Sequence, residues 1–413
     1  MPVIDAAKTF VALFASILLL SMGSALQNTL LSLNLRYSGF PEYIVALTMS
    51  GYHIGMIAGF FICQQAVRQA GHIRAFTAFS AIASVAAVAH GFHSSPVLWF
   101  ILRFMSGICI ASLYMVVESW LNEMVAHNIR GRMLSLYMIV VYFGNGIGQV
   151  MLNMADIEGS ELFMILGILF SLCIVPVALT RSIHPKPLKV VTYNFINLFR
   201  LAPFSMLGSF ISGMILGAFY VMGPVYCIDR GFDLSMITLF MMVTIWSGLI
   251  FQWPMGSISD RFDRLTILAG LSVFVTIVSS LIIMTEVAGF PTLLILSIFF
   301  GLSFTIYPVS VARAQDNIDE ENIVPISAAL ILCYSIGNAL GPILSSGFMH
   351  TAGTSGLYLF CALSTGIMAI LSLFFRRRRA GRTDDLTPFV PLPRTSPVIS
   401  SLHPHRPEEV EMP

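Results

Sequence analysis

Gly256-Ser257-Ile258-Ser259-Asp260-Arg261-Phe262-Asp263-Arg264 is a short polar stretch between two long apolar runs, residues 234–255 and 265–284. A helix needs about 20 apolar residues to cross the hydrocarbon core of a bilayer, so both runs are long enough to span a membrane. The polar stretch is therefore predicted to be a tight turn between two membrane helices, with its charged residues gathered at one membrane surface.

The composition of the 413-residue chain is typical of an integral membrane protein. Hydrophobic residues make up 56% and charged residues 10% of the sequence, against about 25% charged residues in soluble domains. The net charge of +1 argues against a nucleic-acid partner. The six cysteines have no zinc-ligand spacing, and no nucleotide-binding, catalytic or metal-binding motif is present. We therefore expect neither an enzyme nor a bound cofactor or metal.

Apolar runs of spanning length occur about twelve times, which predicts an all-α integral membrane protein with twelve transmembrane helices. The first run, residues 10–35, is too long for a cleaved signal peptide. The longest hydrophilic break divides the spans six and six. The expected units are an N-terminal six-helix bundle at 1–182, a cytoplasmic linker at 183–200, a C-terminal six-helix bundle at 201–380 and a disordered cytoplasmic tail at 381–413.

Lysine and arginine set the expected orientation. If the N-terminus is inside, nearly all basic residues between spans face the cytoplasm, and only Arg36 and Arg230 lie in external segments. Because cytoplasmic loops carry the excess of positive charge, both termini are predicted to be cytoplasmic. The last 30 or so residues (about 381 onward) are rich in proline and lose the apolar pattern, and such segments rarely bury enough apolar area to order themselves.

The two halves of the sequence repeat one another. Residues 144–149 (Gly-Asn-Gly-Ile-Gly-Gln) match residues 337–342 (Gly-Asn-Ala-Leu-Gly-Pro) at a spacing of 193 residues. Tyr114 and Tyr307 are also 193 residues apart, and the Gly-Phe pairs that begin at residues 39 and 231 are 192 apart. Landmarks in one order at one spacing predict two related six-helix bundles in parallel orientation. The glycine pairs in residues 144–148 and 337–341 are expected to permit close helix approach.

The opening stretch has the pattern Gly-x-x-x-Asp-Arg-x-x-Arg and resembles the loop signature of the major facilitator superfamily, with Asp263 where that family usually has glycine. Its counterpart in the first half, residues 64–74, is degenerate. The segments 116–119, 130–132, 252–254 and 307–309 resemble the bacterial YcaD-type branch. The resemblance implies two pseudo-symmetric bundles around a central cavity lined by the first, fourth, seventh and tenth helices. It implies a mechanism class and no particular ligand.

Two ionisable residues lie within the fourth span, where charge is costly and functional roles are the first hypothesis. Arg103 either binds an anionic or polar substrate group through its planar guanidinium or reaches the external headgroups. Glu118 is either a proton-coupling residue, because burial favours the neutral carboxyl, or part of a cytoplasmic latch with Arg68 or the turn at residues 130–132. His53, in the second span, is either a second proton-coupling candidate or a hydrogen-bonded structural residue.

Neutral polar and aromatic residues complete the candidate cavity, where they would suit hydrogen bonding and stacking. With Arg103, the full set of substrate-cavity candidates is Gln27, Asn28, Tyr114, Asn145, Tyr220, Trp246, Gln252, Tyr307 and Asn338. A second set, at the cytoplasmic ends of the helices, is predicted to form ion pairs that steady the outward-open state. This latch comprises Asp260, Arg261, Arg264, Arg313, Arg68 and Arg132.

The sequence therefore predicts a monomeric secondary transporter of the bacterial inner membrane that moves a small solute by alternating access. With no ATP-binding motif, a proton gradient is the expected energy source. Facilitated diffusion is the alternative within transport. A solute receptor or scaffold that does not transport is the alternative from another class.

Overall fold

The computed structural model describes residues 3–125, 129–178, 199, 201–284, 289–316, 323–376, 389 and 394–396. Twelve helical spans in these residues are long and apolar enough to cross a membrane, and no strand occurs in this part of the chain. The twelve-helix prediction is confirmed. The predicted linker at 183–200 and most of the predicted tail at 381–413 fall outside the described residues.

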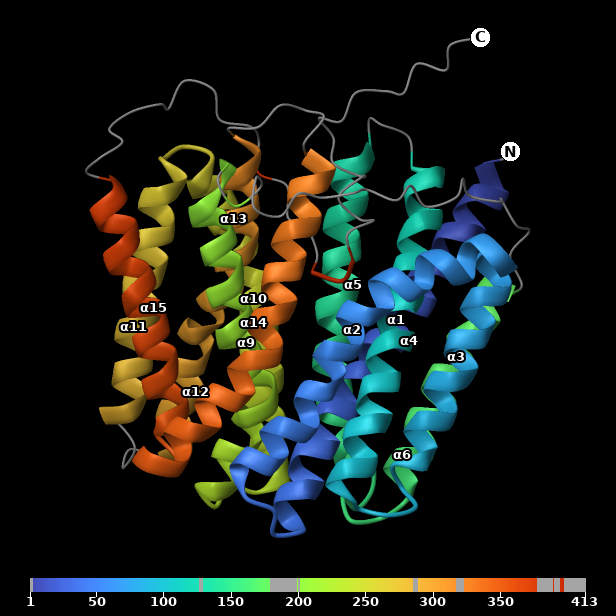
Figure 1. Ribbon diagram of the computed structural model, residues 1–413, viewed down its shortest axis with the longest axis horizontal. Coiled ribbons are helices and arrows are strands. Elements are labelled where there is room, and N and C mark those ends of the chain that lie inside the picture. The colour runs from blue at the N-terminus through green and yellow to red at the C-terminus, as the bar shows by residue number, and fades with distance from the viewer. Residues whose placement is uncertain are drawn as a thin grey trace.

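The N-terminal half forms the first six spans, shown in blue to green in Figure 1. The sixth span consists of two consecutive helices, and a 3-10 turn extends the fifth. These elements are α1 (Val3–Tyr37), α2 (Glu42–Ala70), α3 (His72–Ala89), α4 (Pro96–Met124), α5 (Arg130–Val150), η2 (Met151–Met154), α6 (Glu161–Leu172) and α7 (Ile174–Ala178).

The C-terminal half forms the other six spans, shown in yellow-green to red. Its tenth span changes from α-helix to 3-10 helix and back within the membrane. The elements are α9 (Pro203–Asp229), α10 (Leu234–Ser259), α11 (Arg264–Met284), α12 (Gly289–Phe300), η3 (Gly301–Thr305), α13 (Ile306–Gln315), α14 (Ile323–Ala352) and α15 (Gly356–Arg376).

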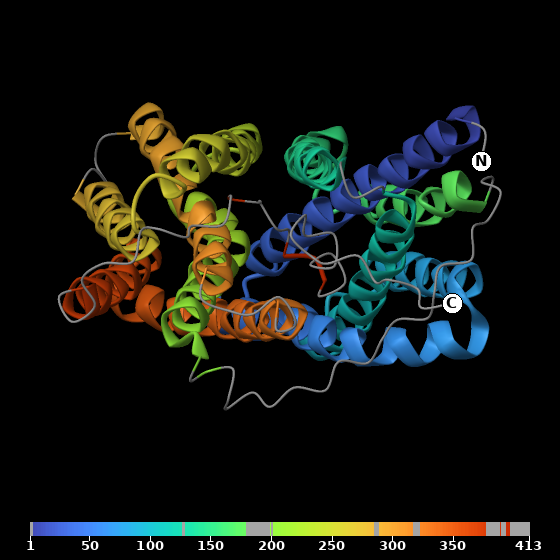
Figure 2. The ribbon, with the colours of Figure 1, turned by 90° about the horizontal axis from the view of Figure 1, so that it is seen from above.

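Helix packing repeats between the halves. In the N-terminal half α1 packs on α5, α2 on α4 and α3 on α6; in the C-terminal half the corresponding helices pair as α9 with α14, α10 with α12 and η3, and α11 with α15. The two bundles lie side by side in both views (Figures 1 and 2). They meet where α2 contacts α14 and where α5 contacts α10. Each contact joins the second helix of one half to the fifth helix of the other, so the pseudo-twofold relation between the halves maps one contact onto the other.

The repeated Gly-Phe pairs have the same structural role in each half. Gly39 and Gly231 follow the first helix of their bundle with φ of 82° and 76°, a conformation that glycine adopts without steric cost. The amide of Phe40 donates to the carbonyl of Leu35 at 3.1 Å, and that of Phe232 donates to Cys227 at 3.2 Å. Both are Schellman-type helix ends, which explains why this landmark recurs.

The repeated glycine pairs bring helices into backbone contact. A Cβ at Gly148 of α5 would lie 2.4 Å from the Met22 carbonyl oxygen of α1, and a Cβ at Gly341 of α14 would lie 2.1 Å from the Met214 carbonyl oxygen of α9. No side chain fits at either distance, so the expectation of close helix approach is confirmed. The first and fifth helices of each half therefore pack in direct backbone contact.

The two ends of the molecule are named here after an aspartate at each. We call them the Asp260 end, where α10 ends and α11 begins, and the Asp229 end, where α9 ends. At the Asp229 end Arg36 Nε of α1 lies 2.7 Å from Asp229 Oδ1 of α9, and Asn153 donates to the Thr238 hydroxyl at 2.9 Å. These contacts join the bundles at the Asp229 end.

Candidate functional site

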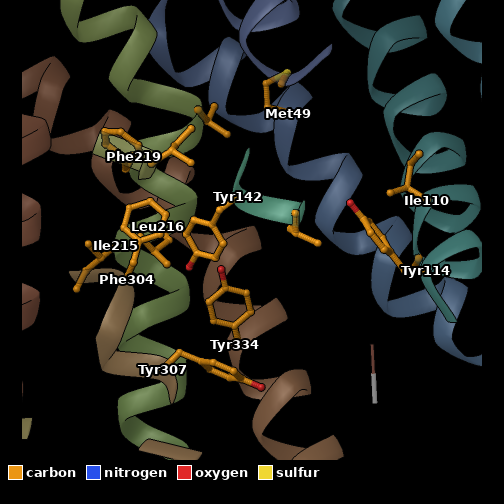
Figure 3. Close-up of a cluster of buried hydrophobic side chains, with 14 of the residues drawn as sticks. Met49, Ile110, Tyr114, Tyr142, Ile215, Leu216, Phe219, Phe304, Tyr307 and Tyr334 are labelled. Atoms are coloured by element: carbon orange, nitrogen blue, oxygen red, sulfur yellow. The ribbon is translucent and has the colours of Figure 1, made fainter. Parts of the chain in front are cut away.

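A cavity of about 180 Å³ lies between the two bundles, at the middle of the molecule. Both halves contribute to its wall, including α1, α2, α4 and α5 from the first and α9 and α14 from the second. Figure 3 shows aromatic residues in or near its wall, with Tyr142, Tyr334 and Tyr307 in succession, Phe304 beside them and Tyr114 on a separate helix. A largely apolar cavity with a few polar groups is typical of small-molecule sites.

Five of the predicted neutral residues line the cavity. They are Asn28, Tyr114, Asn145, Tyr220 and Asn338. The other four lie next to it or behind it. Gln252 donates to the lining Tyr142 hydroxyl at 2.7 Å, Trp246 stacks on Phe143 at 5.6 Å, Tyr307 packs on the lining Tyr334 at 5.0 Å, and Gln27 is buried.

Arg103 is 1% exposed and lies behind the wall instead of reaching a headgroup region. Its Nη2 donates to Asn28 Oδ1 at 2.8 Å, and its guanidinium carbon lies 4.4 Å from the centre of the Tyr52 ring. Both partners line the cavity. Asn28 in turn donates to the Tyr220 carbonyl of α9 at 2.9 Å, so Arg103 is linked through one amide to the opposite bundle.

Glu118 is fully buried and accepts hydrogen bonds from hydroxyl groups. The donors are Tyr137 of α5 and two residues of the C-terminal tail, Thr395 and Ser396. No ion pair of Glu118 with Arg68 or Arg132 occurs in the part of the chain that the structure describes. The described contacts of Glu118 thus contain no arginine partner of the kind that the latch hypothesis proposes.

His53 lines the cavity from α2, beside Tyr52, with their rings 5.2 Å apart. Several lining residues were not among the predicted candidates, notably Ser24, Tyr52, Met56, Tyr142 and Ser335. Tyr52 is adjacent in sequence to His53, and a search for aromatic residues around each titratable residue would have found it. The others resemble ordinary core residues in sequence.

The predicted latch residues lie at the Asp260 end, and the ion pairs described among them join residues of the C-terminal half. Arg264 is buried and lies 3.0 Å from Asp316 and 3.4 Å from Asp260. Arg313 lies 4.0 Å from Asp263.

The remaining members of the predicted set, Arg261, Arg68 and Arg132, are exposed.

Tail residues also bridge the bundles near the cavity. Arg394 and Thr395 line the cavity itself. The Phe389 amide donates to Asp260 Oδ1 at 2.7 Å, and the Phe389 ring occupies the space beside Gly256. The predicted disorder of this tail carried no indication that part of it would reach the cavity.

The sequence matches the Major Facilitator Superfamily over residues 13–251 and 206–403. It is 30% identical over 377 residues to the MFS-type transporter YcaD of Salmonella arizonae, covering 90% of this chain and 96% of the relative. It is 29% identical over 363 residues to YcaD of Escherichia fergusonii, covering 87% and 94%.

Solved transporters share the fold at low sequence identity. A point mutant of the nucleoside transporter NupG superposes with a TM-score of 0.74 at 13% identity, covering 89% of this chain and 99% of its own. A bacterial homologue of the lysosomal transporter Spinster, inward-facing and occupied, gives a TM-score of 0.70 at 12% identity, covering 93% and 99%.

Proposed function

Because the chain belongs to the major facilitator superfamily and is a multi-pass membrane protein, we propose that it is a secondary transporter that moves a small solute by alternating access. The observation that carries the proposal is the cavity between two pseudo-symmetric bundles, closed at one end by the Arg36–Asp229 ion pair. Rocking the bundles about the α2–α14 and α5–α10 contacts would break that pair and open the cavity to the other side.

The orientation follows from the distribution of charge. The Asp260 end carries Arg68, Arg74, Arg132, Arg261 and Arg313, and positive residues accumulate on the cytoplasmic side of membrane proteins. We therefore place the Asp260 end and both termini in the cytoplasm of a bacterial cell, with the chain acting as a monomer in the inner membrane. In this orientation the structure corresponds to the state that is closed to the outside.

Glu118 is the residue we assign to proton coupling. It lies at membrane depth, and its described partners are hydroxyl groups, which can donate to a carboxylate or accept from a carboxyl group. A proton can therefore bind without breaking an ion pair. Tyr137 connects Glu118 to α5, and α5 contacts α10 of the other bundle. Protonation of Glu118 can thus alter its hydrogen bond to Tyr137 and, through α5, the α5–α10 contact between the bundles.

The proposal predicts that conformation depends on pH through Glu118. In proteoliposomes, the accessibility of a cysteine at position 24 from the Asp229 end should change across about pH 5 to 9 in the otherwise wild-type protein. Glu118→Gln, which keeps the shape and removes the titration, should abolish that dependence. The six native cysteines are all buried and free and can be replaced by alanine beforehand.

His53→Gln is the matched control, since it removes the histidine that lines the cavity. We expect it to retain the pH dependence. Loss of the dependence in His53→Gln but not in Glu118→Gln would transfer the coupling to His53. Dependence on neither residue would contradict proton coupling at this cavity and favour facilitated diffusion.

A further inference from the structure

We propose that the cavity binds an organic cation, and that residues 394–396 of the tail are a tethered competitor for this site. The inference rests on the proposed transport function and names its substrate class. It is drawn from what occupies the cavity at the Asp260 end. There, three consecutive tail residues contact an aromatic cluster of one bundle and a carboxylate of the other.

The cation site consists of Phe304, Tyr307 and Tyr334, which we call the aromatic cage. The guanidinium carbon of Arg394 lies 5.6, 5.5 and 5.4 Å from the centres of these three rings. A cation within about 6 Å of a ring centre is attracted by the negative face of the ring. Three such rings around one guanidinium form a site for a planar or compact cation.

The same guanidinium also donates a hydrogen bond to a main-chain carbonyl of the tenth span. Arg394 Nη2 donates to the Phe304 carbonyl, which lies in the 3-10 segment Gly301–Thr305 within the tenth span. A 3-10 segment interrupts the α-helical ladder and often marks a functional position in a helix. Gly301 permits this segment to lie against α10, because a Cβ there would be 1.9 Å from the Ser247 hydroxyl oxygen.

The adjoining tail residues contact the other bundle. Thr395 and Ser396 donate to the two carboxylate oxygens of Glu118, and the Tyr137 hydroxyl lies 2.9 Å from that of Thr395. Glu118 thus faces the segment that carries the Arg394 charge, and neither Glu118 nor Arg103 is among the residues that line the cavity with the segment in place. Behind the segment lie aromatic faces and one carboxylate, a combination that selects a cation with hydrogen-bond donors.

The tail segment is a competitor because alternating access requires it to leave. It joins the two bundles at the Asp260 end, with Arg394 on the C-terminal bundle and Thr395 on the N-terminal bundle. The bundles must approach one another at this end when the Asp229 end opens. Departure of the segment vacates the aromatic cage and Glu118 together. A free cation can then take the place of Arg394, and a bound cation excludes the tail.

The test measures equilibrium binding of radiolabelled benzylguanidine to the full-length protein, with benzylurea as a neutral probe of the same shape. We expect weak binding of benzylguanidine to the wild type and about tenfold tighter binding to Arg394→Ala, because a tethered ligand acts at a high effective concentration. Arg74→Ala, which removes an exposed arginine at the same end, should bind as the wild type does. Benzylurea should not bind measurably to any of them.

A second pair of variants locates the site. In the Arg394→Ala background, Tyr334→Leu should weaken benzylguanidine binding about tenfold or more, while Tyr334→Phe, which keeps the ring, should retain it. Equal affinity of wild type and Arg394→Ala would overturn the competition. Benzylurea binding as tightly, or an undiminished affinity in a Tyr334→Leu protein that remains folded, would overturn the cation site. The motion of the two bundles is measured without any ligand. The proposed transport function can therefore be supported even if the cation site is overturned.

Discussion

Replacing Gly341 with alanine will destabilise the C-terminal bundle by roughly 1–3 kcal/mol, the usual cost of overpacking a well-packed contact. The added methyl group would lie 2.1 Å from the Met214 carbonyl oxygen and 2.8 Å from its carbon. Both are backbone atoms of α9, which cannot move aside as a side chain does. The helices must separate, and the contacts along α9 and α14 are weakened together. The measurement is the midpoint of thermal unfolding in detergent.

Gly347→Ala is the matched control for this prediction. Gly347 lies in the same helix, α14, but nothing lies within 4 Å of the Cβ that it would gain. Alanine is a better helix former than glycine by about 1 kcal/mol, a gain common to both substitutions. We therefore expect Gly347→Ala to be neutral or stabilising. Equal unfolding midpoints for the two variants would show that α9 and α14 do not approach as closely as described.

Asp229→Asn is expected to open the Asp229 end. Arg36 and Asp229 have side chains 26% and 13% exposed, so their ion pair is partly screened and contributes about 1 kcal/mol to the closed state. Loss of that contribution changes the ratio of open to closed molecules about fivefold. Arg36 keeps a partner in Glu42, at 2.9 Å within its own bundle, so the variant removes only the link between bundles.

The readout is the rate at which a membrane-impermeant reagent modifies a cysteine at position 24 from the Asp229 end. Ser24 lines the cavity, and cysteine is close to serine in size. Glu158→Gln removes an exposed carboxylate at the same end and should leave the rate unchanged. A similar increase in both variants would indicate a general charge effect, and no increase in Asp229→Asn would exclude the ion pair as a lock.

The spans and the sites of close helix approach could be predicted from sequence because hydrophobic length and glycine spacing are local properties. The run of residues 265–284 indicates a membrane helix by composition alone, and the glycines at 337 and 341 indicate a close approach without naming the partner. The internal repeat then supplied the two-bundle arrangement. The same repeat located the helix ends at Gly39 and Gly231, where the backbone conformation requires glycine.

The pairing of charged side chains could not be predicted in the same way. Asp260 and Asp263 are three residues apart, and only the three-dimensional turn decides that Arg313 lies near Asp263. Contacts between Glu118 and residues 395 and 396 join positions nearly 280 apart in sequence. The proline-rich composition of the tail predicted disorder, and it gave no signal that Arg394 and Thr395 would line the cavity.

Reciprocal motion of the two ends tests the account most directly. Spin labels at Tyr43 and His350, both exposed at the Asp229 end, report the separation of the bundles there, and labels at Arg132 and Phe262 report it at the Asp260 end. The account predicts that Asp229→Asn lengthens the first distance and shortens the second in the same fraction of molecules. A change at one end without the opposite change at the other would contradict alternating access.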